Sequence, residues 1–82
     1  MQVEVLTPRK IEFQGQAQDV ILPTLSGEIT VLSLHAPLIS VLKAGRIRIK
    51  TKDKEVVIQT EGGVLQVVEN SVTILLKNFH IQ

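Results

Sequence analysis

RIRIK, residues Arg46 to Lys50, alternates a basic and an apolar side chain at every position. Successive side chains of an extended strand point to opposite faces, so this pattern predicts a β-strand. Ile47 and Ile49 are expected to face a core, while the three basic side chains face water. The polar run KDK and the apolar run Glu55–Thr60 come next, and together they predict a hairpin.

Similar short apolar runs continue on both sides of this hairpin. Gly, Pro, Ser and Asn separate them every seven to ten residues, which predicts nine or ten strands and no helix. Valine and isoleucine together number twenty, and their branched Cβ favours a pleated sheet. The expected strands are Gln2–Leu6, Lys10–Phe13, Ala17–Pro23, Glu28–Leu34, Leu38–Leu42, Arg46–Lys50, Glu55–Thr60, Val64–Val68 and Val72–Leu76.

Three of these strands carry apolar side chains on both faces, at residues 20–22, 56–58 and 74–76. Two sheets packed face to face place one face of each sheet in the core. We therefore predict an all-β fold, an antiparallel β-sandwich or flattened barrel of about ten strands, as one domain over residues 1–82. The remaining outward apolar side chains are expected to cover a partner or to shield a sheet edge.

Composition narrows the classes of function. The chain has 82 residues, no cysteine and a net charge of +1. Without cysteine it has no disulfide, thiolate nucleophile or soft metal ligand. No run is long and apolar enough for a signal peptide or a membrane span. The net charge is too small to indicate nucleic acid or lipid as a partner.

Groups that perform catalysis are scarce. His35 and His80 are far apart in the sequence, and neither has a carboxylate cluster beside it. No paired-histidine, CxxC or phosphate-loop motif is present. We therefore expect no enzymatic activity, no metal site and no cofactor; a hydrolase would need a nucleophile that the sequence does not supply.

A basic stripe, Arg46–Lys54 with Lys43 before it, allows an alternative function. A stand-alone β-module could bind nucleic acid or another polyanion through this stripe. Such a row of basic residues more commonly indicates the solvated face of a hairpin. Binding of single strands also uses aromatic stacking, and Phe13 and Phe79 both lie outside the stripe. We therefore expect no nucleic-acid partner.

The segment SGE…HAPL…LKAGRIRI…EGGVLQV…NSVTIL, from Ser26 to Leu75, resembles the N-terminal β-sandwich domain of the epsilon subunit of rotary ATP synthases. The resemblance implies a ten-stranded sandwich at the foot of the central rotor stalk. Such a domain binds the gamma subunit, rests on the ring of c subunits and does no chemistry. It links gamma to the ring, on the cytoplasmic face of the membrane, so that torque couples ion translocation to ATP synthesis or hydrolysis. The membrane is contacted only through the complex.

The resemblance also implies an interface made of Gly27, Glu28, His35 and Pro37. Glu28 takes the position of the glutamate that meets the c-subunit loops. His35 takes the position of a histidine in the same rotor-contacting region. Taken from the residues alone, Glu28 is equally a solvated carboxylate at a hairpin tip. Because Pro37 stiffens the corner, His35 either contacts a partner or braces the corner through a bond to a neighbouring carbonyl.

The chain departs from the family pattern in two places. Where the family has glycines around the turn and the corner, this chain has Thr30 and Leu34, and leucine adopts a positive φ less readily than glycine. The family commonly continues into a C-terminal helical hairpin, whereas this sequence ends at KNFHIQ. Inhibition or ATP sensing by such helices is therefore not expected of these 82 residues.

Overall fold

The computed structural model describes residues 1–77, and all of its regular elements are strands. The predicted all-β class is confirmed, with nine strands in the described part of the chain. They are β1 (Gln2–Leu6), β2 (Ile11–Gln16), β3 (Asp19–Thr24), β4 (Gly27–Leu32), β5 (Leu38–Leu42), β6 (Gly45–Lys50), β7 (Glu55–Thr60), β8 (Gly63–Val68) and β9 (Ser71–Leu76).

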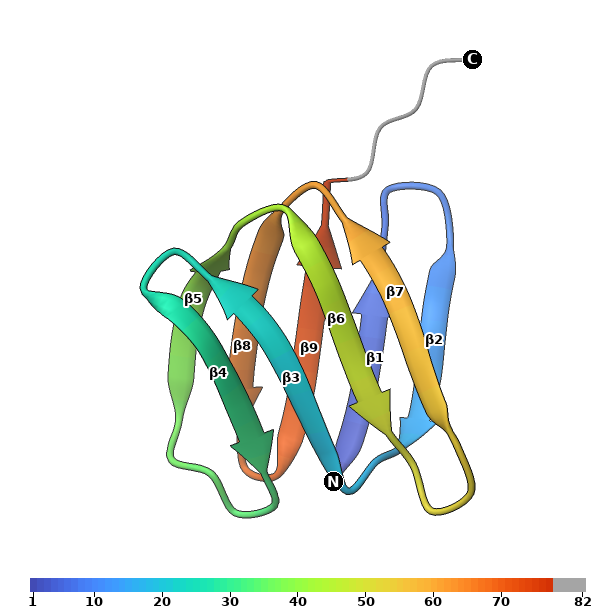
Figure 1. Cartoon of the computed structure of the whole chain (residues 1–82). Helices are drawn as coiled ribbons and strands as arrows, with labels where there is room; N and C mark the ends of the chain where they lie inside the picture. The colour runs from blue at the N-terminus through green and yellow to red at the C-terminus, as the bar shows by residue number, and fades with distance from the viewer. Residues whose placement is uncertain (78–82) are drawn as a thin grey trace.

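The strands form two layers (Figure 1). The front layer has the order β4-β3-β6-β7, and the back layer has the order β5-β8-β9-β1-β2. The two layers join at one corner, where Thr24 of β3 pairs with Leu42 of β5. The path of paired strands ends at β2 and β7, so the sandwich is open between these two strands.

One pairing differs from the antiparallel sandwich that the sequence predicts. Seven of the eight strand pairings are antiparallel, but β1 and β9 run parallel, with Val3 opposite Val72. Tight turns join only antiparallel neighbours, and parallel strands need a long connection. The first and last strands are free of that constraint because the whole domain connects them. Their pairing therefore depends on packing, which turn signals do not reveal.

The core lies between the layers and follows the alternation along each strand. Ile47 and Ile49 of β6 are fully buried, as predicted, and Arg46 and Lys50 are exposed. The other large side chains that are almost completely buried are Val3, Val5, Val20, Leu22, Val31, Leu65, Val67, Val72 and Ile74. Each fully buried aliphatic side chain contributes about 1.5–3 kcal/mol, so this set supplies most of the stabilisation.

Two strands, β2 and β3, continue beyond the ends expected from the sequence. The strand β2 continues through Gly15 to Gln16; a Cβ at Gly15 would lie at an ordinary contact distance, 3.6 Å, from the Phe13 ring. Pro23 lies inside β3, one residue before its end. Proline has no N–H group to donate to a neighbouring strand. Since β6 pairs with β3 only at residues 19–21, no carbonyl of β6 lies opposite Pro23 and needs that donor.

Candidate interaction surface

The outer side of the back layer carries an unusual number of apolar side chains. Ile39 and Val41 of β5 point outward, and Ile39 is 72% exposed. Val64 and Val68 of β8 and Leu75 of β9 point to the same side. These five residues are called the apolar face below. A monomeric protein gains nothing from such exposure, so contiguous apolar side chains of this kind indicate a surface that a partner covers.

The strand register places members of the apolar face side by side. Val41 lies opposite Val64, and Val64 lies opposite Leu75, so three aliphatic side chains form one row across β5, β8 and β9. In the next row Ile39 lies opposite Gln66. Side chains directly opposite one another have Cβ atoms about 5 Å apart, close enough to form one continuous surface.

The outer side of the front layer is different. Its strand β6 presents Arg46, Arg48 and Lys50, and the register sets Lys50 between Asp19 of β3 and Glu55 of β7. These five residues are called the charged face below. The acidic neighbours of Lys50 reduce the net positive charge of the basic stripe. Such a mixture of charges is typical of a solvated strand face. Phe13 is the one aromatic residue within residues 1–77, and it packs against the core instead of this face.

Gly27 and Glu28 lie at the turn between β3 and β4. The turn is short: Leu25 and Ser26 connect the strands, and Thr24 Oγ1 donates a hydrogen bond to the Gly27 carbonyl oxygen at 2.6 Å. Gly27 has a φ of 120°, a conformation that a residue with a side chain rarely adopts. Glu28 is exposed on the front layer, where a partner can reach it.

His35 and Pro37 lie in the loop after β4, at the opposite end of this strand from Glu28 (Figure 1). Glu28 and Leu32 are already four positions apart along β4, which amounts to about 13 Å of strand rise. The structure therefore does not bring the four expected interface residues together in one region. Gly27 and Glu28 form one end, and His35 and Pro37 form the other.

The imidazole of His35 bonds to its own loop. Its Nδ1 lies 2.7 Å from the carbonyl oxygen of Ala36. A carbonyl only accepts hydrogen bonds, so Nδ1 carries the hydrogen in this arrangement. His35 is half-buried, and Pro37 is exposed. This geometry matches the bracing role that the residues alone suggested, and it leaves Nε2 as the ring atom available to a partner.

Leu34, just before His35, has the least favourable backbone in this loop. Its φ is 65°, in the left-handed region that glycine occupies at lower cost. The left-handed conformation costs a leucine about 1–2 kcal/mol. The Leu34 side chain is 86% exposed, the highest fraction among the exposed large hydrophobic side chains of residues 1–77.

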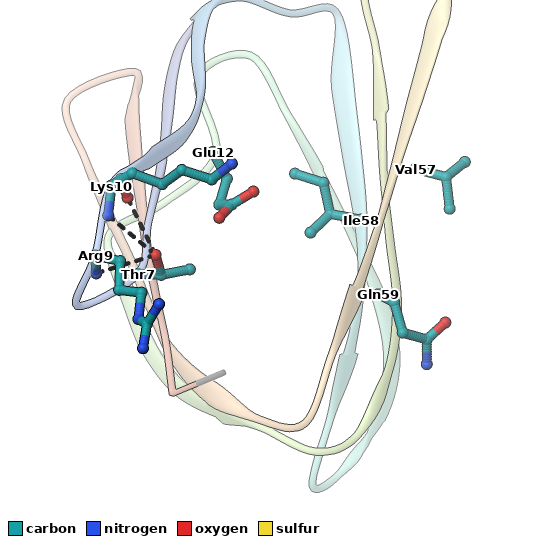
Figure 2. A pocket seen from close by; sticks show the side chains of 7 residues that line it. All are labelled: Thr7, Arg9, Lys10, Glu12, Val57, Ile58 and Gln59. Atoms are coloured by element: carbon teal, nitrogen blue, oxygen red, sulfur yellow. Dashed lines mark hydrogen bonds between the residues drawn. The ribbon is translucent and has the colours of Figure 1, made fainter. Parts of the chain in front are cut away.

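A cavity of about 590 Å³ lies at the open side of the sandwich, between the β1–β2 connection and β7. Figure 2 shows Ile58 pointing from β7 toward Glu12, while Val57 and Gln59 point away. The hydroxyl of Thr7 accepts from the backbone N–H groups of Arg9 and Lys10 at 3.3 and 3.2 Å, so it is engaged in the turn. The lining therefore offers no activated nucleophile.

Other kinds of site have little support in the described part of the chain. Among residues 1–77, no three His, Cys, Asp or Glu side chains gather closely enough to hold a metal ion. His80 lies outside the described residues. The same part of the chain contains no helix of the length and apolarity that crossing a bilayer requires.

The apolar face was only partly foreseen from the sequence. Of the three runs that are apolar on both sides, only 74–76 contributes to it, through Leu75. The main contributor, β5, reads LISVL, in which both faces carry aliphatic side chains. The run LISVL indicates that β5 has an apolar outer side, but the sequence alone does not show which of its two faces is outward.

Comparisons with known proteins identify the family of this chain. A model of the family described as "ATP synthase, Delta/Epsilon chain, beta-sandwich domain" matches residues 1–81. The ATP synthase epsilon chain of Brevibacillus brevis is 46% identical over 76 residues, which cover 92% of this chain and 58% of the relative. The chloroplastic epsilon chain of Tetradesmus obliquus is 43% identical over 75 residues, 92% of this chain and 55% of the relative.

Two solved assemblies contain a chain with the same fold. One is the central stalk and c-ring of the Tetrahymena thermophila mitochondrial ATP synthase, with a TM-score of 0.83, 19% identity, and coverage of 95% of this chain and 63% of that chain. The other is the OSCP/F1/c-ring assembly of the Euglena gracilis mitochondrial ATP synthase, with a TM-score of 0.86, 19% identity, and coverage of 93% and 49%.

At this identity the two structures support the fold alone. The chain spans 58% and 55% of the two curated relatives described above, so the comparison concerns little more than half of their length. The family match, however, extends over nearly every residue of this chain. The chain therefore belongs to the family of the β-sandwich domain of the ATP synthase delta/epsilon chain.

Proposed function

We propose that this chain is a non-catalytic subunit of the central stalk of a rotary ATP synthase. It links the gamma subunit to the membrane ring of c subunits, so that torque couples ion translocation to ATP synthesis or hydrolysis. The observation that carries this proposal is the apolar face on β5, β8 and β9, in a chain of the delta/epsilon family. A rigid sandwich with an uncovered apolar side is suited to permanent docking.

The apolar face is the proposed contact with gamma. Interfaces that persist through many turnovers are the more hydrophobic class, with aliphatic and aromatic side chains at their centre. Ile39 and its neighbours provide such a centre, whereas the charged face would form at most a rim. His35 and Pro37 lie at the end of β4 next to this side of the molecule and are proposed to contact the same partner.

Gly27 and Glu28 are proposed to meet the polar loops of the c-ring. They lie at the far end of β4 from His35, so one rigid domain can contact two partners at once. An exposed carboxylate at the edge of an interface contributes more to steering and orientation than to affinity. Under this proposal the domain sits on the cytoplasmic face of the membrane and touches the bilayer only through the complex.

Nucleic-acid binding through the basic stripe is not supported. Acidic residues lie beside Lys50 on the charged face, and the family match is to an ATP synthase subunit. The basic side chains are better explained as the solvated side of the β6–β7 hairpin.

The direct test is binding to a purified gamma subunit, followed by size-exclusion chromatography with light scattering. We expect a complex with one copy of each subunit and no hydrolysis of ATP by the chain alone. Failure to form a complex with gamma, while the chain itself remains folded by circular dichroism, would contradict the proposed function.

A further inference from the structure

Leu34 combines two features that both oppose the stability of a small domain. Its backbone has a φ of 65°, and its side chain is 86% exposed. An exposed leucine gains no burial to offset the strained backbone, and glycine or asparagine would occupy the same conformation more cheaply. Strained residues that surrounding contacts hold in place are concentrated at binding and switch sites.

The loop is held in its strained form by neighbouring groups. The backbone N–H of Leu34 donates to the Oδ1 atom of Asn70 at 3.1 Å, across 36 positions of sequence. The N–H of His35 donates to the carbonyl oxygen of Leu32 at 3.1 Å, which closes the turn. Pro37 limits the backbone of Ala36 to extended conformations. Together these contacts hold the backbone of Leu34, and with it the direction of the Cα–Cβ bond, before any partner arrives.

We propose that Leu34 is a preformed apolar anchor that inserts into an apolar pocket of the subunit covering the apolar face, with Asn70 as its positioning residue. This inference rests on the proposed function, because it takes gamma as that subunit. The anchor would add to the affinity that the apolar face supplies.

Continuity with the apolar face identifies the occupant as the same partner. Asn70, which holds the Leu34 backbone, lies in the turn between β8 and β9, two residues after Val68. Val68 is the member of the apolar face nearest to this turn. A subunit seated on the face therefore reaches Leu34 without a second docking event. Glu69, exposed in the same turn, disfavours an anionic lipid surface as the occupant.

The test measures the affinity of the full chain for purified gamma by isothermal titration or biolayer interferometry. We expect Leu34→Ala and Leu34→Gly to weaken binding about 10-fold to 100-fold, the range of a buried anchor. The melting temperature should be unchanged for Leu34→Ala and roughly 2–6 °C higher for Leu34→Gly. Leu32→Ala is the matched control, because Leu32 is also an exposed leucine, at 56%, but it faces outward on the front layer. It should bind gamma as the wild type does.

A double-mutant cycle with Asn70→Gly tests the positioning role. Glycine keeps the positive φ of 63° available at this position and removes only the side-chain acceptor. We expect Asn70→Gly to weaken binding about 3-fold to 10-fold when Leu34 is present, and to change it less than 2-fold in the Leu34→Gly background. Equal losses in the two backgrounds would overturn the positioning role.

The outcomes separate this inference from the proposed function. If the wild type binds gamma and the Leu34 variants bind within 2-fold of it, the anchor is overturned and the proposed function survives. If the wild type does not bind gamma, both are overturned. If the Leu34 variants keep their affinity for gamma but lose binding to phosphatidylglycerol vesicles or lose self-association, the occupant is a lipid surface or a second copy, and the inference is wrong.

Discussion

The two outer sides of this sandwich are built from the same kind of strand but face different surroundings. Beneath both, alternate residues are fully buried in one shared core. Outside, the front layer presents the charged face, with Lys50 between Asp19 and Glu55, and the back layer presents the apolar face. The core sets the fold in both cases. The difference outside it is the basis of our proposal that gamma covers the back layer.

The largest expected effect comes from placing a charge on each outer side. Ile39→Asp puts a carboxylate at the most exposed position of the apolar face. We expect affinity for gamma to fall at least 100-fold, about 3 kcal/mol, because an unpaired charge is desolvated there. Val57→Asp is the matched control, since Val57 is 51% exposed on the front layer. It should alter binding less than 2-fold. Similar losses for both variants would remove the distinction between the two sides.

The second prediction concerns the support beneath the apolar face. A Cβ at Gly63 would lie 2.1 Å from the carbonyl oxygen of Leu75, so β8 and β9 approach too closely for any side chain. Gly63→Ala should lower the free energy of unfolding by about 2–3 kcal/mol through this overpacking. Urea denaturation followed by circular dichroism measures it.

Gly15→Ala is the control for that prediction. A Cβ at Gly15 would meet only the Phe13 ring, at 3.6 Å, which is an ordinary contact distance. We expect a change of at most about 0.5–1 kcal/mol, in the stabilising direction, because alanine loses less backbone entropy than glycine. If Gly15→Ala and Gly63→Ala lower the free energy of unfolding equally, the close approach of β8 and β9 is not the cause of the loss at Gly63.

A smaller effect is expected at Leu34, with the opposite sign. Leu34→Gly relieves the strain of the positive φ but adds backbone entropy to the unfolded state, so the net gain should be about 0.5–1 kcal/mol. The melting temperature of the free chain should rise by roughly 2–6 °C. A fall in the melting temperature would mean that Leu34 contributes contacts that stabilise the free domain.

The smallest effect is expected on the charged face. Replacing Arg46 and Arg48 by glutamine should change both stability and the affinity for gamma by less than about 0.5 kcal/mol, since both substitutions are on a strand face outside the core. Titrations with gamma at low and high salt measure how much of the affinity is electrostatic. A strong loss of affinity on neutralisation would show that the partner also touches the front layer.

Much of the fold could be predicted because the alternation of apolar and polar residues within each strand can be read directly from the sequence. The bounds of β1, β5 and β7 agree with those expected from residues 2–6, 38–42 and 55–60. What could not be predicted depends on contacts between distant strands. The parallel pairing of β1 with β9 has no turn signal. The separation of Glu28 from His35, in contrast, already follows from the expected strand Glu28–Leu34 and agrees with β4 in the structure.

The interaction surface was harder to predict for a related reason. In β5 both the odd-numbered and the even-numbered positions carry aliphatic side chains. The run LISVL therefore does not indicate whether Leu38 or Ile39 faces inward. Only packing against the other layer makes Leu42 buried and leaves Ile39 and Val41 outside. The strain at Leu34 could be suspected from the missing glycine, but its strong exposure could not.

The central claim, that the back layer is the side a partner covers, can be measured by labelling. The chain has no cysteine, so Ile39→Cys and Val57→Cys each introduce one thiol on one outer side. We predict that gamma slows maleimide labelling at residue 39 at least tenfold and leaves the rate at residue 57 unchanged. Protection at residue 57 with continued labelling at residue 39 would contradict the account.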